Sequence, residues 1–501
     1  MLLLCLLLLA APPDVTVLRW ASPDSSKPLS FLEWKSSLVS GPAWNVKLVA
    51  PCSQSDDPLV DILVEDSLAS TLAPLLDTMM LDIAAEGYRV AAYSVRGTSA
   101  ESLRKFLRAE YDSGLVAAVL VGDLPLAWFQ LIDDWNSNGR RDPDEHYEEF
   151  PCDLYLMDID GNWQDSLRRY GTADSLVQGA DGIYDIHRGN VGPEIGISRL
   201  VTSTLGNEVE LIRQYLDRSH RYRLGLLRVT DRALVYIDDD WYPWAAGWNW
   251  DVGILYPDRV FVCDSEVTRA AEYRPRIDTA AYQFIQLCAH SWPGGHQLWY
   301  NNKRSYDWFY AYEIPGLDPV ACFYNLFACS NVRYTESGYC GGRYVFESSS
   351  GLAAIGSTKT GSMLEFRDFY LPLAQGRSLA LAFCDWFSAQ AEDGFEPWER
   401  SWYYGMCLVG DGMLKPRWTV AVNEDFAEPV PRALLPTIVR AGTRLALPAG
   451  AALFDHLGRR IAAVPFNIRC PSFDTPAALP AGLYFVVPGP GQRALPLTVV
   501  R

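Results

Sequence analysis

The chain of 501 residues is too long for one ordinary domain, and its 49% hydrophobic and 21% charged residues are typical of a folded protein. A net charge of -18 argues against nucleic acid as a partner, because a phosphate backbone is bound by a basic surface. An acidic surface favours solubility and is also compatible with basic substrates.

The N-terminus has the features of a short secretory signal. Residues 2–9 read LLLCLLLL and are followed by small residues and prolines, although no positive residue precedes them. The run is too short to span a bilayer, and no later segment has about eighteen uninterrupted apolar residues. We therefore expect residues 1–13 to be a signal segment and the protein to be secreted or at the cell surface, without a transmembrane segment.

Residues 14–57 carry prolines, tryptophans and serines without a clear period, so we expect an N-terminal wrapping or propeptide-like segment. From residue 58 strand and helix patterns alternate. The first such strands and helices are predicted at 58–65, 67–86, 89–95, 98–114 and 115–123. This alternation implies right-handed βαβ crossovers and a parallel sheet.

Residues 133–185 differ, because they are acidic, loop-rich and full of glycine and asparagine. Later elements are predicted at 204–222 (helix), 232–238, 259–264 and 352–360 (strands) and 368–391 (helix). After a linker at 416–435, residues 436–501 show short alternating runs punctuated by proline and glycine. That pattern predicts a separate small β-sandwich.

Two apolar runs each stop at a reactive side chain. FIQLCAH ends at His290, and ACFYNLFAC ends at Cys329. Such runs are typical of buried parallel strands, whose carboxyl ends collect catalytic groups. If the strands are neighbours, the pair can act as nucleophile and base, and the small polar residues that follow leave backbone N–H groups to hold an oxyanion. A cysteine after an apolar run is also a common structural residue.

The best-specified motif runs from Asp134 to Glu145 and fits D-x-[DN]-x-[DN]-G-x5-E. Side-chain oxygens of Asp134, Asn136 and Asn138, the carbonyl of Arg140 and the carboxylate of Glu145 would surround a calcium ion. A proline near the end and the lack of helical flanks predict a calcium loop outside the EF-hand fold. The alternative is a solvated acidic turn.

A second acidic cluster has no fixed spacing. Its members are Asp158, Asp160, Asn162, Asp165, Asp181 and Asp185. They could supply another calcium site or form a hydrated loop. Paired carboxylates also suggest a glycosidase, although nothing in the sequence places two of them across a cleft.

Other arrangements are less specific. Cys288, His290 and His296 match no common zinc spacing, and we expect His296 on a loop beside the cleft. The isolated histidines, which we expect at the surface, are His146, His187, His220 and His456. The eleven cysteines form no CxxC motif, and their odd number leaves at least one free thiol in an exported monomer. No G-x-S-x-G elbow is present, and IGSTKTGS lacks the P-loop order.

Several ordered blocks resemble gingipain-like cysteine peptidases. They are AVLVGDLP, CDLYLMDIDGNWQD, PEIGISRL, FIQLCAHSWPGGH, FACSN, YCGGRYVF and LAAIGSTKTGSML. The resemblance assigns residues 58–415 to a peptidase region with an acidic calcium-loop insert at 133–185. It implies a caspase-like α/β/α sandwich with a mainly parallel sheet. It also implies Cys329 as nucleophile, His290 as general base and an oxyanion hole from the backbone of Ser291 and Cys329.

Two features depart from that family. A glycine usually follows the histidine, whereas here Ser291 would add a side chain that crowds the cleft. The caspase signature Q-A-C-x-G is reduced to Ala328-Cys329.

The tail, with LFDHLGRR and LPAGLYFVV, resembles type IX secretion sorting domains or FlgD-type immunoglobulin-like modules. That resemblance implies secretion machinery as a partner.

The sequence thus predicts a secreted, calcium-stabilised cysteine endopeptidase that acts on proteins or peptides through an acyl-enzyme. The main alternative is a catalytically silent surface or adhesion protein that retains the peptidase fold, and a carboxylate glycosidase is a third. A gingipain relative would favour Arg or Lys at the cleaved bond, but the sequence names no acidic pocket residue.

Overall fold

The computed structural model describes residues 19–416, apart from 25, 39–42, 54 and 228–229, and the backbone of seven strands between 438 and 500. The chain divides into two compact units, residues 1–419 and 420–501. The predicted signal segment and all but the first residue of the predicted linker lie outside the described residues.

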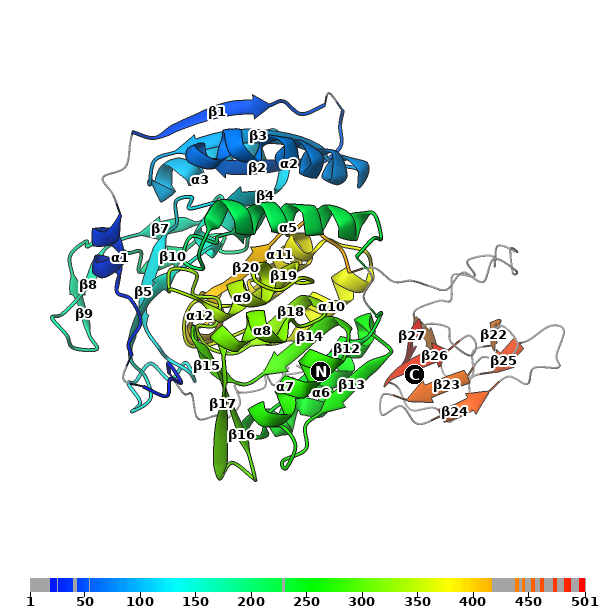
Figure 1. Cartoon of the computed structure of the whole chain (residues 1–501). Helices are drawn as coiled ribbons and strands as arrows, with labels where there is room; N and C mark the ends of the chain where they lie inside the picture. The colour runs from blue at the N-terminus through cyan, green and yellow to red at the C-terminus, as the bar shows by residue number, and fades with distance from the viewer. Residues whose placement is uncertain are drawn as a thin grey trace, which may run out of the picture. The chain divides into compact units, whose positions relative to one another are not determined.

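The described part of the first unit is built on an eleven-stranded, mostly parallel sheet with the order β1-β3-β2-β4-β11-β20-β19-β18-β14-β12-β13 (Figure 1). Its strands are β1 (Asn45–Ala50), β2 (Leu59–Glu65), β3 (Arg89–Arg96), β4 (Leu115–Val121), β11 (Gly196–Leu200), β12 (Ala233–Ile237), β13 (Arg259–Val262), β14 (Tyr282–Cys288), β18 (Ala321–Phe327), β19 (Ala353–Ser357) and β20 (Met406–Gly410). Central strands such as β14 and β18 are buried at every position, which explains their largely apolar sequences.

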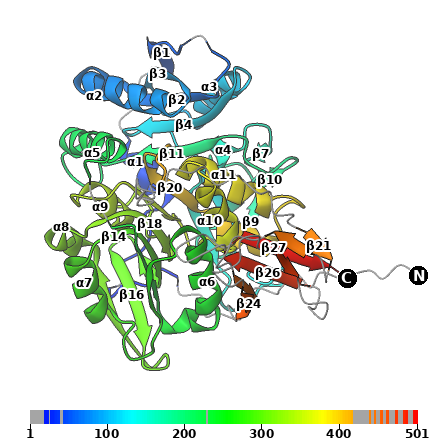
Figure 2. The ribbon, with the colours of Figure 1, turned by 90° about the vertical axis from the view of Figure 1, so that its right-hand side faces the viewer.

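Helices cover both faces of this sheet (Figure 2). One layer contains α2 (Asp66–Ala85), α5 (Glu208–Arg223), α7 (Ala270–Thr279), α8 (Ile314–Leu317) and α9 (Cys340–Phe346). The other contains α3 (Ala100–Tyr111), α4 (Leu154–Met157), α6 (Tyr242–Leu255), α10 (Phe366–Ala374) and α11 (Leu379–Gln390). The predicted α/β class with a large, mostly parallel sheet is confirmed, and the layers are compatible with an α/β/α sandwich.

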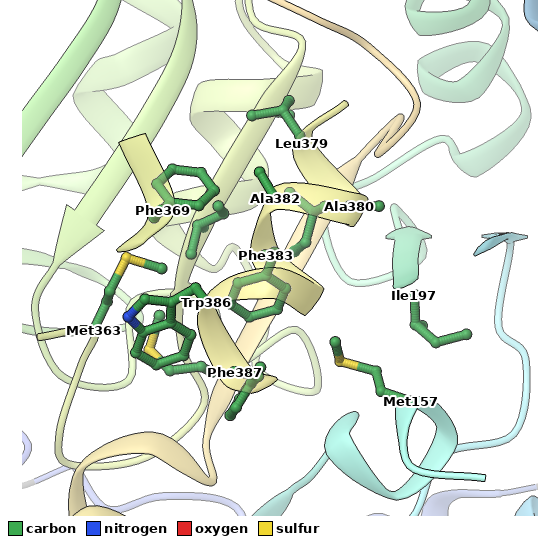
Figure 3. Close-up of a cluster of buried hydrophobic side chains, with 14 of the residues drawn as sticks. Met157, Ile197, Met363, Phe369, Leu379, Ala380, Ala382, Phe383, Trp386 and Phe387 are labelled. Carbon is green, nitrogen blue, oxygen red and sulfur yellow. The ribbon is translucent and has the colours of Figure 1, made fainter. Parts of the chain in front are cut away.

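Helix α11 shows how tightly a layer packs on the sheet (Figure 3). Phe383 and Trp386 are fully buried, and the Trp386 indole donates to the carbonyl of Leu364 at 2.7 Å. Ala380 approaches the start of β11 so closely that a Cβ at Gly196 would lie 3.0 Å from its carbonyl oxygen. A larger residue at position 196 would push the helix away from the sheet.

The predicted elements from residue 58 to 123 are confirmed as β2, α2, β3, α3 and β4. The single helix predicted over 368–391 is wrong, because the chain forms α10 and α11 with a break at Gly376, whose φ of +89° is outside the helical region. Helix α5 starts later than predicted, at Glu208, because the Asn207 side chain caps it by accepting from the Glu210 N–H.

Shorter elements surround the sheet. The predicted insert at 133–185 and the residues that flank it contain β5 (Trp128–Ile132), β6 (Tyr147–Pro151), β7 (Asn162–Gln164), β8 (Leu167–Arg169), β9 (Leu176–Gln178) and β10 (Ile186–Arg188). A three-stranded sheet follows β14 and contains β15 (His290–Trp292), β16 (Gly295–Tyr300) and β17 (Ser305–Tyr310). The remaining described α-helices are α1 (Phe31–Ser37) and α12 (Pro397–Tyr403).

The second unit is described by backbone alone. A five-stranded sheet has the order β21-β27-β26-β23-β24, and β22 pairs with β25. The strands are β21 (Ile438–Arg440), β22 (Arg444–Ala446), β23 (Ala452–Asp455), β24 (Arg460–Ala463), β25 (Ser472–Asp474), β26 (Gly482–Val487) and β27 (Leu495–Val500). The β-sandwich stays a prediction.

Among the described helices, α2 is the one that is long and apolar enough to cross a membrane by length and composition. It places Leu68, Leu72 and Ile83 in the core beside the sheet, as a core helix does.

One buried acid predicts a pH-dependent stability. Asp61 is fully buried in β2, and neither carboxylate oxygen has a hydrogen-bond partner. Burial, with a smaller contribution from Glu110, raises its pKa from 3.8 to about 8. The folded protein therefore holds a proton that the unfolded chain has lost between about pH 4 and 8, so stability should fall as pH rises through this window.

Replacing Asp61 with Asn should flatten this slope and raise the free energy of unfolding at pH 8 by about 1–3 kcal/mol. Chemical denaturation at pH 5 and pH 8 measures both effects, with the exposed Asp77→Asn as control. An unchanged slope in Asp61→Asn would contradict the assignment.

Candidate active site

The carboxyl ends of β14 and β18 bring His290 and Cys329 together. The two strands pair in parallel, and their register ends with Cys288 opposite Phe327. Both reactive residues lie two positions beyond that pair, and they line one narrow cavity. Its other walls are Trp241, Ala289, Phe327, Ala328, Gly361, Ser362 and Trp402. The strand adjacency that a Cys–His pair requires is therefore present.

Asp240 holds the imidazole of His290. Its Oδ2 lies 2.8 Å from Nε2 of the histidine, whose side chain is 1% exposed. Lys303 Nζ lies 3.1 Å from Asp240 Oδ1. Burial alone would raise the pKa of Asp240, but His290 and Lys303 outweigh burial and lower it. Because Nε2 is held by the carboxylate, Nδ1 is the nitrogen left to exchange a proton with the thiol or a substrate.

Cys329 carries a buried thiol that is neutral at rest. Burial raises its pKa to about 11, and a hydrogen bond from the Gly361 N–H offsets this only in part. Nearby charges partly cancel, because Glu148 raises the pKa and Lys359 lowers it. A thiol of this kind is not a preformed thiolate, so its proton must be removed during attack, which is the work of a general base.

Ser291 ties the two strand ends together. Its hydroxyl is fully buried and donates to the carbonyl oxygen of Cys329. The side chain does not line the cavity between His290 and Cys329, so the expectation that it crowds the cleft is wrong. The carbonyl of Ser291 accepts from the Ala21 N–H at 3.2 Å, on the side of β15 away from β16. Because the N–H and C=O of one residue in a strand point the same way, the Ser291 N–H also faces that outer edge.

A buried lysine supports the loop that follows the cysteine. The side chain of Lys359 is 0% exposed, and its Nζ lies 3.1 Å from both Asp133 Oδ1 and Glu148 Oε2. Its carbonyl accepts from the Ser330 N–H at 2.8 Å. Burial raises the pKa of Asp133, whereas Lys359 and Arg19 together lower that of Glu148. The β5–β6 hairpin thus brings two carboxylates next to the Cys329 loop.

The predicted calcium loop connects β5 to β6 and has no flanking helix, as expected. Its glutamate is buried, and Glu145 Oε1 and Oε2 accept from the backbone N–H groups of Trp135 and Asp142. Asp134 Oδ1 is buried without a hydrogen-bond partner. Of the predicted ligand side chains, Asp134 thus keeps a buried oxygen whose acceptor capacity is unused within the loop.

The remaining predicted ligands follow the same turn. Asn138 Oδ1 accepts from the N–H of Arg140 at 2.6 Å, and Asn136 Oδ1 accepts from the N–H of Asn138 at 3.1 Å. Both amide nitrogens donate to Asp142 Oδ2 at 2.9 Å, which fixes which end of each amide is the oxygen.

The second acidic cluster is split. Asp158 and Asp160 join Glu194, with ligand atoms within 4.8 Å of one another. Asp165 instead accepts from backbone N–H groups of residues 181 and 182, and Asp185 accepts from those of residues 166 and 167. These carboxylates stabilise turns, and we do not assign them to a glycosidase cleft.

Two histidines are not where we expected them. His296 is fully buried in β16, where burial lowers its pKa to about 3, and its Nε2 lies 3.3 Å from Cys340 Sγ. His187 is 1% exposed, stacks on Trp163 at 3.7 Å and bonds to Asp158. Both expectations of a surface or loop position are wrong, because an isolated histidine in a sequence gives no sign of a buried partner. His146 and His220 are half-buried beside aspartates, and His456 lies outside the described residues.

The sequence analysis missed Asp240 and Trp241. A usable signal existed, because three aspartates at 238–240 stand at the end of the predicted strand at 232–238, at the same edge as the candidate pair. Trp402, which closes the cavity from α12, had no such signal.

No known family model matches the sequence, and no curated protein matches it significantly.

The raised pKa of Cys329 predicts how its reactivity depends on pH. Because the thiol is protonated below about pH 11, the rate of alkylation by iodoacetamide should rise about tenfold per pH unit from 7 to 9. Peptide mass mapping of Cys329 over time measures this rate, and Cys329→Ala identifies the modified site. A rate that is flat from pH 6 to 8 would instead indicate a thiolate–imidazolium pair.

Proposed function

We propose that the chain is a secreted, gingipain-like cysteine peptidase that hydrolyses peptide bonds through Cys329 and His290. The observation that carries this proposal is their meeting in one cavity at the ends of adjacent parallel strands. The ordered sequence blocks that resemble the gingipain-like family support it. A caspase-like fold is proposed on the same grounds.

In the proposed reaction, the sulfur of Cys329 attacks the peptide carbonyl carbon while Nδ1 of His290 accepts the thiol proton. The C–N bond then breaks, the amine leaves with that proton, and a thioester remains on the sulfur. Water next attacks the thioester and gives a proton to His290, the acid product departs, and the thiolate recovers its proton. Asp240 stabilises the imidazolium that forms twice in this cycle.

The oxyanion would be held by backbone N–H groups. The Ser291 N–H faces the outer edge of β15, and we assign it with the N–H of Cys329 to this role. The bond from the Ser291 hydroxyl to the Cys329 carbonyl keeps the two groups at a fixed separation.

The substrate would be a protein or peptide with a basic residue near the cleaved bond. Glu148 is the acidic residue that the sequence alone does not identify. It is ionised, its side chain is 12% exposed, and its charge acts on the Cys329 thiol. A guanidinium or ammonium group of a substrate would find a partner there.

Residues 1–38 comprise the predicted signal segment and the first part of the predicted propeptide-like segment. Once they are removed through a protease site engineered after Leu38, the purified protein should cleave Arg- or Lys-containing peptides. Cys329→Ala and His290→Ala should lose at least 10³-fold in kcat/KM. Asp240→Asn should lose about 10²-fold, mainly in kcat, and its pH profile should shift because the imidazolium loses its partner. Folded variants that retain wild-type activity would sink the proposal.

A silent surface protein that keeps the peptidase fold is the second candidate function. Two features favour it. The thiol of Cys329 is protonated and so a weak nucleophile, and the cavity that it lines is narrow. Absence of cleavage in the same experiment, with Cys329 reacting no faster than other buried thiols, is the outcome that it predicts.

We further propose that the loop from Asp134 to Glu145 binds a structural calcium ion. Asp134, Asn136, Asn138, the carbonyl of Arg140 and Glu145 would hold it, and the ion would neutralise the acidic turn beside the hairpin. The orphaned oxygen of Asp134 supports this assignment.

Calcium at 10 mM should raise the free energy of unfolding by about 1–3 kcal/mol, as expected for a weak extracellular site. Asp134→Ala or Glu145→Gln should remove this gain, whereas Asp160→Asn in the second acidic cluster should keep it. Thermal unfolding with calcium or with chelator gives the comparison. A gain lost only in Asp160→Asn would move the site to Asp158, Asp160 and Glu194.

Export and the role of the tail belong to the same proposal. The N-terminal apolar run and the tail blocks in residues 436–501 are its support, with secretion machinery as the partner of the tail.

A further inference from the structure

Strand β13 is the last strand at one end of the main sheet (Figure 1), and its outer edge pairs with no other described strand. The carbonyl of Asp258 accepts from the Ala233 N–H at 3.1 Å, so it points toward β12. Because backbone groups alternate along a strand, the N–H and C=O of Phe261 point the other way, to the free edge. Edge strands are commonly shielded by proline or lysine, and β13 contains neither.

A groove follows this free edge. It has a volume of about 900 Å³, and residues 260–263 line it along the strand. The side chains of Val260 and Val262 lie on one face of the sheet and that of Phe261 lies on the other, so the groove extends around the edge. Phe261 and Tyr242, at the start of α6, are 38% and 62% exposed, which gives the groove an apolar surface. An extended chain would find both backbone groups and apolar contacts there.

One cation in the groove lacks a partner. Arg276 of α7 lines the groove, and its Nε is buried without a hydrogen-bond partner among the described residues. A charged donor that is left unsatisfied is unfavourable, and a carboxylate is the acceptor that satisfies a guanidinium best. The groove therefore lacks one anionic group, which a ligand can supply.

The other charged groups of the groove already have partners. Asp239 Oδ2 accepts from the Ser265 hydroxyl at 2.8 Å and from the Lys303 N–H at 3.2 Å. Asp264 Oδ1 accepts at 2.8 Å from the backbone N–H two residues farther along. The ammonium group of Lys303 pairs with Asp240. The unsatisfied group is thus cationic, although the whole chain has a net charge of -18.

One end of the groove adjoins the candidate active site. Lys303 lines the groove, and its Nζ lies 3.1 Å from Oδ1 of Asp240, the carboxylate that holds His290. Asp239, the residue before Asp240, lines the groove as well. A chain that lies along β13 therefore leads toward the pair of His290 and Cys329.

From these features we propose that the groove along β13 binds an extended segment of the protein substrate as an added strand, with a carboxylate of that segment on Arg276. The inference rests on the proposed function, because it takes the bound segment to be part of the chain that Cys329 cleaves. It adds a second recognition element, an acidic strand-forming stretch that is separate from the basic residue near the cleaved bond. Backbone bonds to Phe261 supply affinity, and the carboxylate supplies specificity.

Peptide binding to the Cys329→Ala chain, which cannot cleave the probe, tests the role of Arg276. The probe is a fluorescein-labelled peptide of alternating threonine and valine with one central glutamate, and its twin carries glutamine instead. Fluorescence anisotropy should show that the glutamate peptide binds about tenfold more tightly than its twin. Arg276→Gln should abolish this difference, whereas Arg213→Gln at an exposed position of α5 should keep it.

A second pair of variants tests the backbone edge. Phe261→Pro removes an N–H that faces the free edge and leaves the bonds to β12 in place, so both peptides should bind about tenfold more weakly. Phe261→Leu keeps that N–H and should retain most of the affinity. Thermal unfolding of each variant confirms that it is folded.

Equal affinities for the two peptides, or affinities unchanged in Arg276→Gln and Phe261→Pro, would overturn the inference. A dimer of the full chain that is seen by light scattering and lost in Phe261→Pro would assign the edge to a second copy instead. Peptide binding in the groove without any cleavage by the wild-type protein would overturn the peptidase and keep the groove as a peptide site. Cleavage without binding in the groove would do the reverse, so the two failures are distinguishable.

Discussion

The parallel register of β12, β14 and β18 is the constraint on which the candidate site depends. Ile237 pairs with Cys288, and Cys288 pairs with Phe327, so the three strands end at one level. Two residues beyond the ends of these three strands lie Asp239, His290 and Cys329, and Asp240 directly follows Asp239. A slip of one residue in either pairing would turn one reactive side chain to the opposite face. All three strands are buried at every position, so a slipped pairing would force their side chains to repack against both helical layers.

Burying carboxylates beside Cys329 costs free energy, and the ammonium group of Lys359 offsets part of that cost. Two carboxylates beside a buried thiol would repel each other and the developing thiolate, but a fully buried ammonium lies between Asp133 and Glu148. The same residue accepts from the Ser330 N–H, so the charge network and the Cys329 loop share one anchor. Since Asp133 directly precedes the predicted calcium loop, ion pairs with Lys359 join this acidic hairpin to the candidate site, although the two are far apart in sequence.

Much of the fold could be predicted from local pattern. Strands β2, β14 and β18 are predominantly apolar runs, and α2 and α3 have helical spacing and glycine stops, so each signal lies within the element itself. Predicting the site required knowing which elements contact one another in the fold. Adjacent strands could be guessed for His290 and Cys329, and the aspartates at the end of β12 were a signal for Asp240. Trp402, which lines the cavity, and Lys359, which accepts from the Ser330 N–H, come into place through contacts that no local pattern encodes. Likewise, the buried partner of His187 is 29 residues away, and a lone histidine reads as polar surface.

Ser291, the residue that departs from the gingipain pattern, belongs to the support of the cysteine. Ser330 has a φ of +54°, a left-handed conformation that costs a non-glycine residue about 1 kcal/mol and needs fixed neighbours to persist. On one side Lys359 accepts from its N–H, and on the other the hydroxyl of Ser291 donates to the preceding carbonyl, that of Cys329. A glycine at 291 would leave that buried carbonyl with one donor fewer. The serine therefore contributes to holding the thiol in place, and it does so from outside the cavity that a substrate would enter.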